Sequence, residues 1–496
     1  MVEEKTVPAT PGVRLLANSR VRGLLLLAPL LFLIFCQPFT TPTDPDYWWH
    51  VRTGQYIFQT GIIPRVDLFS YTAVGQPWVT HEWGTELLFY VVSHVLGYVG
   101  NVAVFGLVEA LTALAVYAAC RRRGLGEPAA AIMMLAGYSM AVTNATVRPQ
   151  VLTAFLLAVC ALLLTLYQRG NAKALWPLPV IFAVWVNLHG GYVVGFALLG
   201  MTIVGEVVAE RLHRPAAPVR PLIGVGALSA LATLLNPHGV EAWTYPFTFF
   251  GSANPVMGLI TEWQSPNFHD LLFLPFAASL LLLILLGVGR EPLGPTELLW
   301  TLAFAFLGLE GVRHIPLYAV VVIPLLGARL QAEVPVLRYS LAAWRRPALL
   351  AVAALAIVFV AVIPLFSPQR RARLQLGWEP NTQGFPVAAT AYLRSHDLPG
   401  NLFNEYDWGG YLEDELFPRY KVFIDSRPDM YGAELTDEYL QVVGTRPGWR
   451  AILARYDVRI VLVRKGSSLA LTLSGDPAWQ TIYDGTVAQL FERSPR

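Results

Sequence analysis

The sequence predicts a polytopic α-helical membrane protein that carries a small α/β soluble domain at its C-terminal end. Of the 496 residues, 55% are apolar and only 14% are charged, whereas soluble domains have about 25% charged residues. The charges are also unevenly spread, since 31 of the 130 residues from Ser367 onward are charged, against 39 of the first 366. Finally, the first part contains about eleven apolar stretches long enough to cross the roughly 30 Å of a hydrocarbon core.

These stretches divide the chain into an expected transmembrane domain, 1–366, and an expected extracytoplasmic domain, 367–496. A helix needs about 17–25 residues to cross the bilayer. The predicted spans lie at 23–39, 101–120, 127–145, 150–167, 174–189, 191–210, 220–235, 271–289, 296–312, 315–329 and 347–366.

The orientation of the spans follows from the positions of Lys and Arg, which short loops retain on the cytoplasmic side. Such residues flank the first span and recur at alternate junctions, as in 121–123, so the N-terminus is expected in the cytoplasm. The apolar stretch 82–98 would reverse this pattern if it crossed the membrane, and we expect it to be an interfacial helix in the first outer loop. No small-residue cleavage site follows the first span, which is therefore expected to be retained. An odd number of spans then places the residues after 366 on the outer face of a plasma membrane.

The C-terminal part alternates short apolar runs with helical stretches, which is typical of a small α/β domain. Helices are expected at 387–395 and 434–443. The expected strands lie at 401–403, 421–425, 459–463, 480–483 and 487–491.

Net charge and cysteine positions exclude two classes of protein. The formal net charge is +2 and no basic tract is interleaved with aromatic residues, so nucleic acid is not an expected partner. Cys36, Cys120 and Cys160 all lie in apolar runs, which indicates packing residues rather than a disulfide framework.

Polar residues differ in kind between the two sides of the membrane. On the inner side they are mostly arginines, which orientation alone explains. On the outer side carboxylates, imidazoles and guanidinium groups meet at several span ends, where uncompensated polarity is costly unless it faces a cavity. We therefore expect a cleft at the outer surface. Its candidate residues are Asp44, Asp46, His50, His81, Glu82, Arg148, His189, His238, Glu262, Trp263, Arg313 and His314.

Each group of candidates has an alternative without a catalytic role. The tryptophans Trp48, Trp49, Trp83, Trp243 and Trp263 are also explained as an aromatic belt at the membrane surface. The histidines that precede glycines, at 189 and 238, also suit the capping of broken helix ends. Arginines at 148 and 313 could reach lipid headgroups, and the aspartates at 44 and 46 could cap a helix that begins at 47.

The mixture of groups suits transfer of a sugar from a polyprenyl-phosphate donor. Such a reaction needs a base for the acceptor proton and a cationic or metal partner for the leaving phosphate. Asp46 is the first candidate for the base, with Asp44 and Glu82 as further catalytic candidates, and a divalent metal ion such as Mg or Mn is a candidate cofactor. The predicted ligands of the donor phosphate are Arg148, Arg313, His189 and His314, since guanidinium groups match phosphate oxygens. Acceptor-binding or supporting roles fall to His50, His81, His238, Glu262 and Trp263.

The whole layout resembles the GT-C superfamily of integral-membrane glycosyltransferases, which includes protein O-mannosyltransferases, aminoarabinose transferases and oligosaccharyltransferase catalytic subunits. The shared features are a cytoplasmic N-terminus, an acidic first outer loop and an outer C-terminal domain. Many members carry Pro-Asp-Glu or a similar acidic pair after the first span. Pro45-Asp46 matches it, while Tyr47 stands at the second acidic position, so the resemblance implies that Asp44 or Glu82 supplies the second carboxylate. The chain looks like the uncharacterised bacterial branch of this superfamily, whose lipid donor would be a polyprenyl phosphate and whose acceptor would be a glycan, a lipid or a protein.

Two segments of the tail have both a functional and a structural interpretation. The stretch 406–411, Tyr-Asp-Trp-Gly-Gly-Tyr, is similar to the acceptor-peptide motif of oligosaccharyltransferases, but it also suits a turn between a strand and a helix. The polar loop 425–431 follows an expected strand, where α/β domains often place a site. A structural pair of Asp425 and Arg427 explains it equally well.

Two other classes of function compete with the enzyme. A lipid-linked substrate transporter or flippase would show internal repeats and ionisable residues near the bilayer midplane. Only Glu109 and the broken hairpin at Gly190-Gly191 favour transport. A membrane scaffold, or a degenerate family member without activity, would need no acid, imidazole and guanidinium groups at so many junctions. The distribution of polar residues favours the enzyme.

Overall fold

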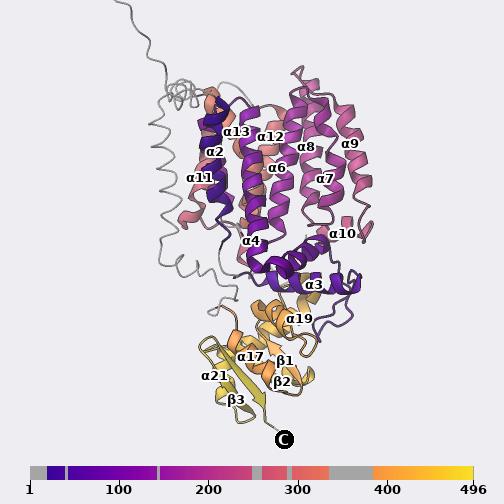
Figure 1. Ribbon diagram of the computed structural model, residues 1–496, viewed down its shortest axis with the longest axis vertical. Helices are drawn as coiled ribbons and strands as arrows, with labels where there is room; N and C mark the ends of the chain where they lie inside the picture. Colours follow the sequence, from indigo (N-terminus) through magenta and orange to yellow (C-terminus); the bar gives the residue numbers. More distant parts are fainter. Residues whose placement is uncertain are drawn as a thin grey trace, which may run out of the picture.

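The computed structural model describes residues 19–39, 43–141, 146–248, 260–287, 293–333 and 384–494. They form a bundle of helices, a layer of helices across one end of the bundle, and a mixed α/β unit beyond that layer (Figure 1). The expected span at 347–366 and the boundary between the two expected domains lie outside the described residues.

The bundle is packed around α13 (Ile315–Glu333), in which every residue from Ile315 to Gly327 is buried. Burial on all faces is expected for a helix that is apolar all round. Among the described residues, four helical segments are long and apolar enough to cross a membrane, namely Trp83–Arg122, Gln150–Gln168, Tyr192–Arg211 and Val312–Glu333. The count of about eleven spans and the orientation stay predictions. The bundle also contains α2 (Ser19–Phe35), α4 (Trp83–Arg122), α5 (Glu127–Ala141), α6 (Gln150–Gln168), α7 (Leu178–Trp185), α8 (Tyr192–Arg211), α9 (Val219–Ala232), α11 (Leu274–Gly287) and α12 (Pro295–Glu310).

The layer across the bundle end consists of α3 (Asp46–Thr60) and the first part of α4 (Figure 1). Helix α4 breaks at Gly97, whose backbone has φ 67° and ψ −170°, a conformation open almost only to glycine. The helix expected at 82–98 therefore ends at this break, and the span expected at 101–120 is the second part of α4. The position of the layer at a membrane surface stays a prediction.

The α/β unit contains a four-stranded mixed sheet in the order β1-β2-β4-β3. Strand β1 runs parallel to β2, whereas β2 and β3 are both antiparallel to β4. The strands are β1 (Asn401–Asn404), β2 (Val458–Arg464), β3 (Trp479–Asp484) and β4 (Ala488–Arg493), and the helices are α17 (Val387–Ser395), α18 (Gly409–Leu416), α19 (Pro428–Val443), α20 (Trp449–Arg455) and α21 (Ser468–Ser474).

The strand predicted at 421–425 is wrong. This segment forms only an isolated bridge, in which Val422 pairs with Ser70. Ser70 belongs to the first loop, the part of the chain between the expected spans 23–39 and 101–120. On the side toward β1, the side chain of Asn404 accepts a hydrogen bond from the Phe423 N–H and donates one to the Ile424 carbonyl, both at 2.8 Å. A side chain thus replaces the backbone ladder that would have made the segment a fifth strand.

The α/β unit and the layer share one hydrophobic core. Trp48 of α3 contacts Phe385 and Tyr411 edge-on, with ring centroids 5.7 and 5.2 Å apart. A Cβ on Gly410 would lie 2.9 Å from the Pro45 carbonyl oxygen, so α18 passes closely over the start of α3. Because Trp48 and Trp49 are buried, they are packing residues in this contact rather than members of an aromatic belt.

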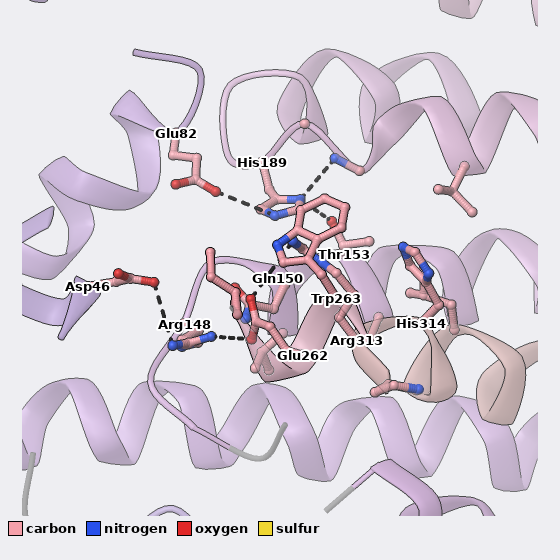
Figure 2. Close-up of a pocket in the computed structure, with 18 of the residues that line it drawn as sticks. Asp46, Glu82, Arg148, Gln150, Thr153, His189, Glu262, Trp263, Arg313 and His314 are labelled. Atoms are coloured by element: carbon pink, nitrogen blue, oxygen red, sulfur yellow. Dashed lines mark hydrogen bonds and ion pairs between the residues drawn. The ribbon is translucent and has the colours of Figure 1, made fainter. Parts of the chain in front are cut away.

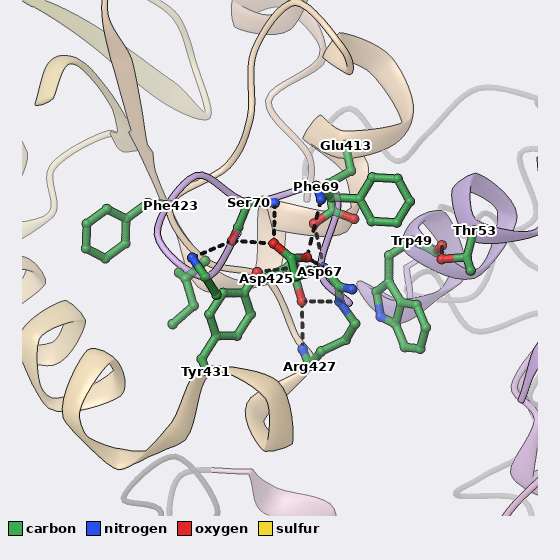
Figure 3. Close-up of polar contacts among 12 residues, drawn as sticks. Trp49, Thr53, Asp67, Phe69, Ser70, Glu413, Phe423, Asp425, Arg427 and Tyr431 are labelled. Atoms are coloured by element: carbon green, nitrogen blue, oxygen red, sulfur yellow. Dashed lines mark hydrogen bonds and ion pairs between the residues drawn. The ribbon is translucent and has the colours of Figure 1, made fainter. Parts of the chain in front are cut away.

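A buried ion cluster also joins the first loop to the α/β unit (Figure 3). The Arg427 guanidinium lies 2.5 Å from Asp425, 3.2 Å from Asp67 and 3.5 Å from Glu413. Burial raises the pKa of Glu413. Burial would also raise the pKa of Asp425, but the charge and hydrogen bonds of Arg427 hold it below its usual value. Asp425 and Arg427 thus form the structural pair that was one interpretation of this loop.

Candidate active site

A cavity of about 1330 Å³ lies where the bundle, the layer and the α/β unit meet. It is lined by side chains from α3, α4, α6 and α13, and by residues between 405 and 443. Figure 2 shows its polar part. Ten of the twelve candidate residues line it: Asp46, His50, His81, Glu82, Arg148, His189, Glu262, Trp263, Arg313 and His314.

Arg148 is the centre of the first polar group in the cavity. It lies just before α6, and its guanidinium contacts three carboxylates from two other segments. Both Nε and Nη2 bond the Asp44 carboxylate, the latter at 2.9 Å, and Nη2 lies 3.5 Å from Asp46. On the opposite side Nη1 donates to Glu262 at 2.5 Å. The guanidinium therefore fixes the carboxylates of the α3 start against that of the 261–263 turn.

Asp46 is the first residue of α3 and faces the cavity. Its backbone N–H donates to Asp44 Oδ1 at 3.0 Å, but the N-cap position is Pro45 and the helix begins at Asp46 rather than at 47, so the capping interpretation of the two aspartates does not hold as expected. Burial raises the pKa of Asp46 to about 7, although the charge of Arg148 acts in the opposite direction. A carboxylate with this pKa is suited to act as a general base near neutral pH.

Glu82 is the centre of the second polar group, where three histidines surround it. Its carboxylate lies 3.7 Å from His50, 3.5 Å from His81 and 3.4 Å from His189. Burial would raise the pKa of Glu82, but the histidines, His81 first, more than offset this and hold it below its usual value. Burial lowers the pKa of both His50 and His189 to about 4. At neutral pH this group thus contains an ionised Glu82 beside the neutral rings of His50 and His189.

The hydrogen bonds of His189 define its tautomer. The N–H of Gly191 donates to its Nδ1 at 2.9 Å, and the hydroxyl of Thr153 lies 2.8 Å from the same atom. Because Nδ1 is an acceptor, a neutral ring carries its proton on Nε2, which faces Glu82. His189 therefore caps the break before α8, as one interpretation expected, and at the same time presents an N–H in the cavity.

Arg313 and His314 form the third polar group, in the turn that joins α12 to α13. The Arg313 guanidinium stacks over the Trp263 ring at 4.0 Å and lies 3.8 Å from Glu262. The Nδ1 atom of His314 lies 3.1 Å from Glu310. A guanidinium held over an indole ring is oriented in advance for an anionic ligand.

Two candidates do not line the cavity. Asp44 is connected to it through Arg148 and through the backbone N–H of Asp46. His238 is buried beside the first loop, where its Nε2 lies 3.3 Å from the Thr80 carbonyl and its Nδ1 lies 3.8 Å from Glu241. Its supporting role in the site stays a prediction.

Comparison with known proteins gives matches in structure only. No protein-family model and no curated protein sequence matches the chain. The archaeal oligosaccharyltransferase AglB from Archaeoglobus fulgidus, in complex with an inhibitory peptide and a dolichol-phosphate, is similar with a TM-score of 0.61 and 13% identity over 89% of this chain and 69% of that one. ArnT from Cupriavidus metallidurans bound to undecaprenyl phosphate is similar with a TM-score of 0.54 and 15% identity, over 97% of this chain and 100% of that one. The arabinofuranosyltransferase AftD from Mycobacteria is similar with a TM-score of 0.56 and 16% identity, over 97% of this chain and 40% of that one. The chain has the GT-C fold.

The GT-C fold confirms the resemblance drawn from the layout of the sequence, and together with the apolar helices it indicates a membrane location. The resemblance drawn from the sequence singled out the acidic first loop. In this chain the loop supplies Asp44 and Asp46 at the start of α3 and Glu82 at the start of α4. All three lie at the end of the bundle that faces the α/β unit.

The sequence interpretation missed most of the contribution of the α/β unit to this cavity. Glu405, Tyr406, Asp407, Ser426 and Tyr439 all line it. The signals in the sequence were the likeness of 406–411 to an acceptor motif and the polar loop 425–431, which contains Ser426. In the structure this stretch is a 3-10 turn, Tyr406–Trp408, followed by α18, so the turn interpretation is correct and the turn also borders the cavity.

A divalent metal does not fit the donor set of the cavity. Among the described residues there is no group of three or more His, Cys, Asp or Glu side chains that could hold a metal ion. The carboxylates that approach one another most closely, Asp44, Asp46 and Glu262, are directed at the Arg148 guanidinium.

Proposed function

We propose that the chain transfers a sugar from a polyprenyl-phosphate-linked donor to an acceptor at the outer face of the membrane. One observation carries this proposal: a single cavity has both a polar and an apolar wall. Besides the three polar groups, it is lined by apolar residues of α4, α5, α12 and α13 inside the bundle, among them Ala113, Val116, Met134, Leu317 and Val320. Such a cavity suits a ligand with a charged head and a hydrocarbon tail.

The solved structures support the same class of donor. AglB is in complex with a dolichol-phosphate and ArnT is bound to undecaprenyl phosphate. By analogy of fold, we assign a lipid phosphate to the cavity of this chain. Arg313, His314 and His189 would hold its oxygens, because they present a guanidinium fork and imidazole N–H groups near the apolar wall.

The reaction that we propose is a single displacement. Asp46 accepts the proton of an acceptor hydroxyl or amide while the acceptor atom bonds to the anomeric carbon. The bond between that carbon and the phosphate oxygen breaks, and polyprenyl phosphate leaves with the bonding electrons. One displacement inverts the configuration at the anomeric carbon. The acceptor, a glycan, a lipid or a protein, would enter between α3 and the α/β unit, beside Tyr406 and Tyr439.

This chemistry implies the topology that the sequence predicts. The N-terminus would lie in the cytoplasm of a bacterial cell, and the α/β unit would lie outside the plasma membrane, where lipid-linked sugars are presented to extracytoplasmic acceptors. The transporter and scaffold alternatives gain no specific support from the cavity, because neither needs a carboxylate with a pKa near neutrality beside fixed guanidinium groups.

The base assignment predicts that Asp46→Asn lowers the rate of transfer by about 10² to 10⁴-fold, the usual contribution of a general base. The assay uses the full chain in lipid nanodiscs with radiolabelled polyprenyl-phosphate sugars, and thermal unfolding verifies that the variant is folded. Asp397→Asn is the matched control, because Asp397 is exposed and its carboxylate pairs with Arg419 in the α/β unit. Full turnover by a folded Asp46→Asn protein would rule out the base, and no consumption of any lipid-linked sugar by the wild type would rule out the function.

A further inference from the structure

The position of Arg148 among carboxylates is unusual for a site that handles a phosphate. Three carboxylates converge on one guanidinium: Asp44 and Asp46 from the start of α3, and Glu262 from the 261–263 turn. The Arg148 side chain is 20% exposed. An arrangement in which several acidic oxygens surround one point is also how proteins hold a divalent cation.

The hydrogen-bond geometry shows that the central point is taken by the guanidinium itself. A guanidinium has five N–H groups in a planar fork. Here Nε and Nη2 both contact Asp44, Nη2 also approaches Asp46 at 3.5 Å, and Nη1 donates to Glu262 at 2.5 Å. Every nitrogen of the fork is therefore directed at a carboxylate.

A divalent ion could enter this group only by displacing Arg148. Mg²⁺ and Mn²⁺ need several oxygens within about 2.0–2.6 Å of one point. The ion would also bring two positive charges next to Arg148 and Arg313, both of which contact Glu262. Since arginine stays protonated at any physiological pH, the repulsion cannot be relieved by loss of a proton.

We propose that the Arg148 guanidinium occupies the place of a divalent cation in this cavity, so that sugar transfer by this chain needs no metal. The statement that transfer needs no metal rests on the proposed function, whereas the statement that Arg148 takes the place of a cation concerns binding alone. Arg148 would orient Asp46 and balance the charge of Asp44 and Glu262. This is the work that a bound cation does when it organises carboxylates around a reacting phosphate.

The test is a titration with Mn²⁺ alone, followed by electron paramagnetic resonance, on the full chain in nanodiscs without substrate. The wild type is expected to bind no Mn²⁺ up to concentrations on the order of 1 mM, the weak end of carboxylate sites. Arg148→Ala leaves Asp44 and Asp46 without their counter-ion and Glu262 with Arg313 alone, and it is expected to bind one Mn²⁺ at least about tenfold more tightly than the wild type. The additional change Asp44→Asn should remove that gain.

Arg123→Ala is the matched control, because Arg123 forms an ion pair at 2.7 Å with a single carboxylate, Glu297, elsewhere in the bundle. It should gain no Mn²⁺ binding. Transfer by the wild type should be unchanged by a chelator, which needs no variant to fold. Three results would each overturn the proposal. The wild type would bind one Mn²⁺ tightly, a folded Arg148→Ala protein would fail to bind Mn²⁺, or a chelator would abolish transfer and added Mn²⁺ would restore it. Absence of transfer under all conditions would instead count against the proposed function, while the binding result stands.

Discussion

At the scale of single residues, Asp46 links the geometry of the cavity to a measurable pH dependence. Burial raises the pKa of Asp46 to about 7, and only the ionised form can accept the acceptor proton. The rate of transfer should therefore fall about tenfold for each pH unit below about 7 and level off above it. The measurement is kcat/KM against pH for the purified chain.

The Arg148 charge gives this pH profile an internal control. Arg148 lowers the pKa of Asp46 against the effect of burial, so Arg148→Ala in the presence of a chelator should move the break in the profile to higher pH. A profile that is flat from about pH 5 to 8 would exclude Asp46 as the base, since a group with a pKa near neutrality must titrate there.

The kinds of residue in the cavity could be predicted from the sequence, but their pairing could not. Acidic, imidazole and guanidinium groups stand out against the apolar background of the span ends, and ten of the twelve candidates line the cavity. However, Arg148 contacts Asp44 and Glu262, which lie 104 and 114 residues away from it in the sequence. Periodicity and composition carry no information on such distant contacts, so Arg148 looked like a free phosphate ligand.

At the scale of elements, the break in α4 determines where Glu82 lies. Gly97 has φ 67° and ψ −170°, and a side chain there costs about 1–3 kcal/mol. Gly97→Ala should therefore lower the thermal unfolding temperature in detergent and reduce transfer, because the first part of α4 carries Glu82 at its start.

Gly200→Ala is the matched control for Gly97. Gly200 lies inside α8 with open space around it, and alanine is a better helix former than glycine by about 1 kcal/mol. It should leave the unfolding temperature unchanged or raise it. If both substitutions changed the unfolding temperature equally, the backbone conformation of Gly97 would not be the cause of the destabilisation.

Prediction of elements failed where a side chain took over a role of the backbone. The short apolar run at 421–425 is typical of a strand, and its residues Val422, Phe423 and Ile424 are all buried. The neighbouring backbone groups are bonded instead by Asn404 and by the first loop. A pattern of hydrophobicity indicates burial, whereas the partner of the strand depends on the tertiary structure.

At the scale of the whole molecule, the first loop and the α/β unit form one body around the cavity. The sequence predicts two domains from the change in charge density, and it gives no sign that they share a core. The contact depends on Asp67 and Arg427, which are 360 residues apart. It also depends on Trp48 and Tyr411, whose rings pack edge-on.

The Arg427 cluster is therefore expected to hold the α/β unit against the first loop beside the cavity. Arg427→Met would leave Asp67, Asp425 and Glu413 buried without their cation, and loss of one partner of a buried ion group costs about 3–5 kcal/mol. The α/β unit should loosen from the first loop, so that hydrogen exchange rises together in 62–80 and 421–432 and transfer is lost. Arg450→Met, which breaks an ion pair with Asp476 at an exposed arginine, should cost at most about 1 kcal/mol. Increased exchange in 421–432 alone would mean that the cluster stabilises only the α/β unit and does not join it to the first loop.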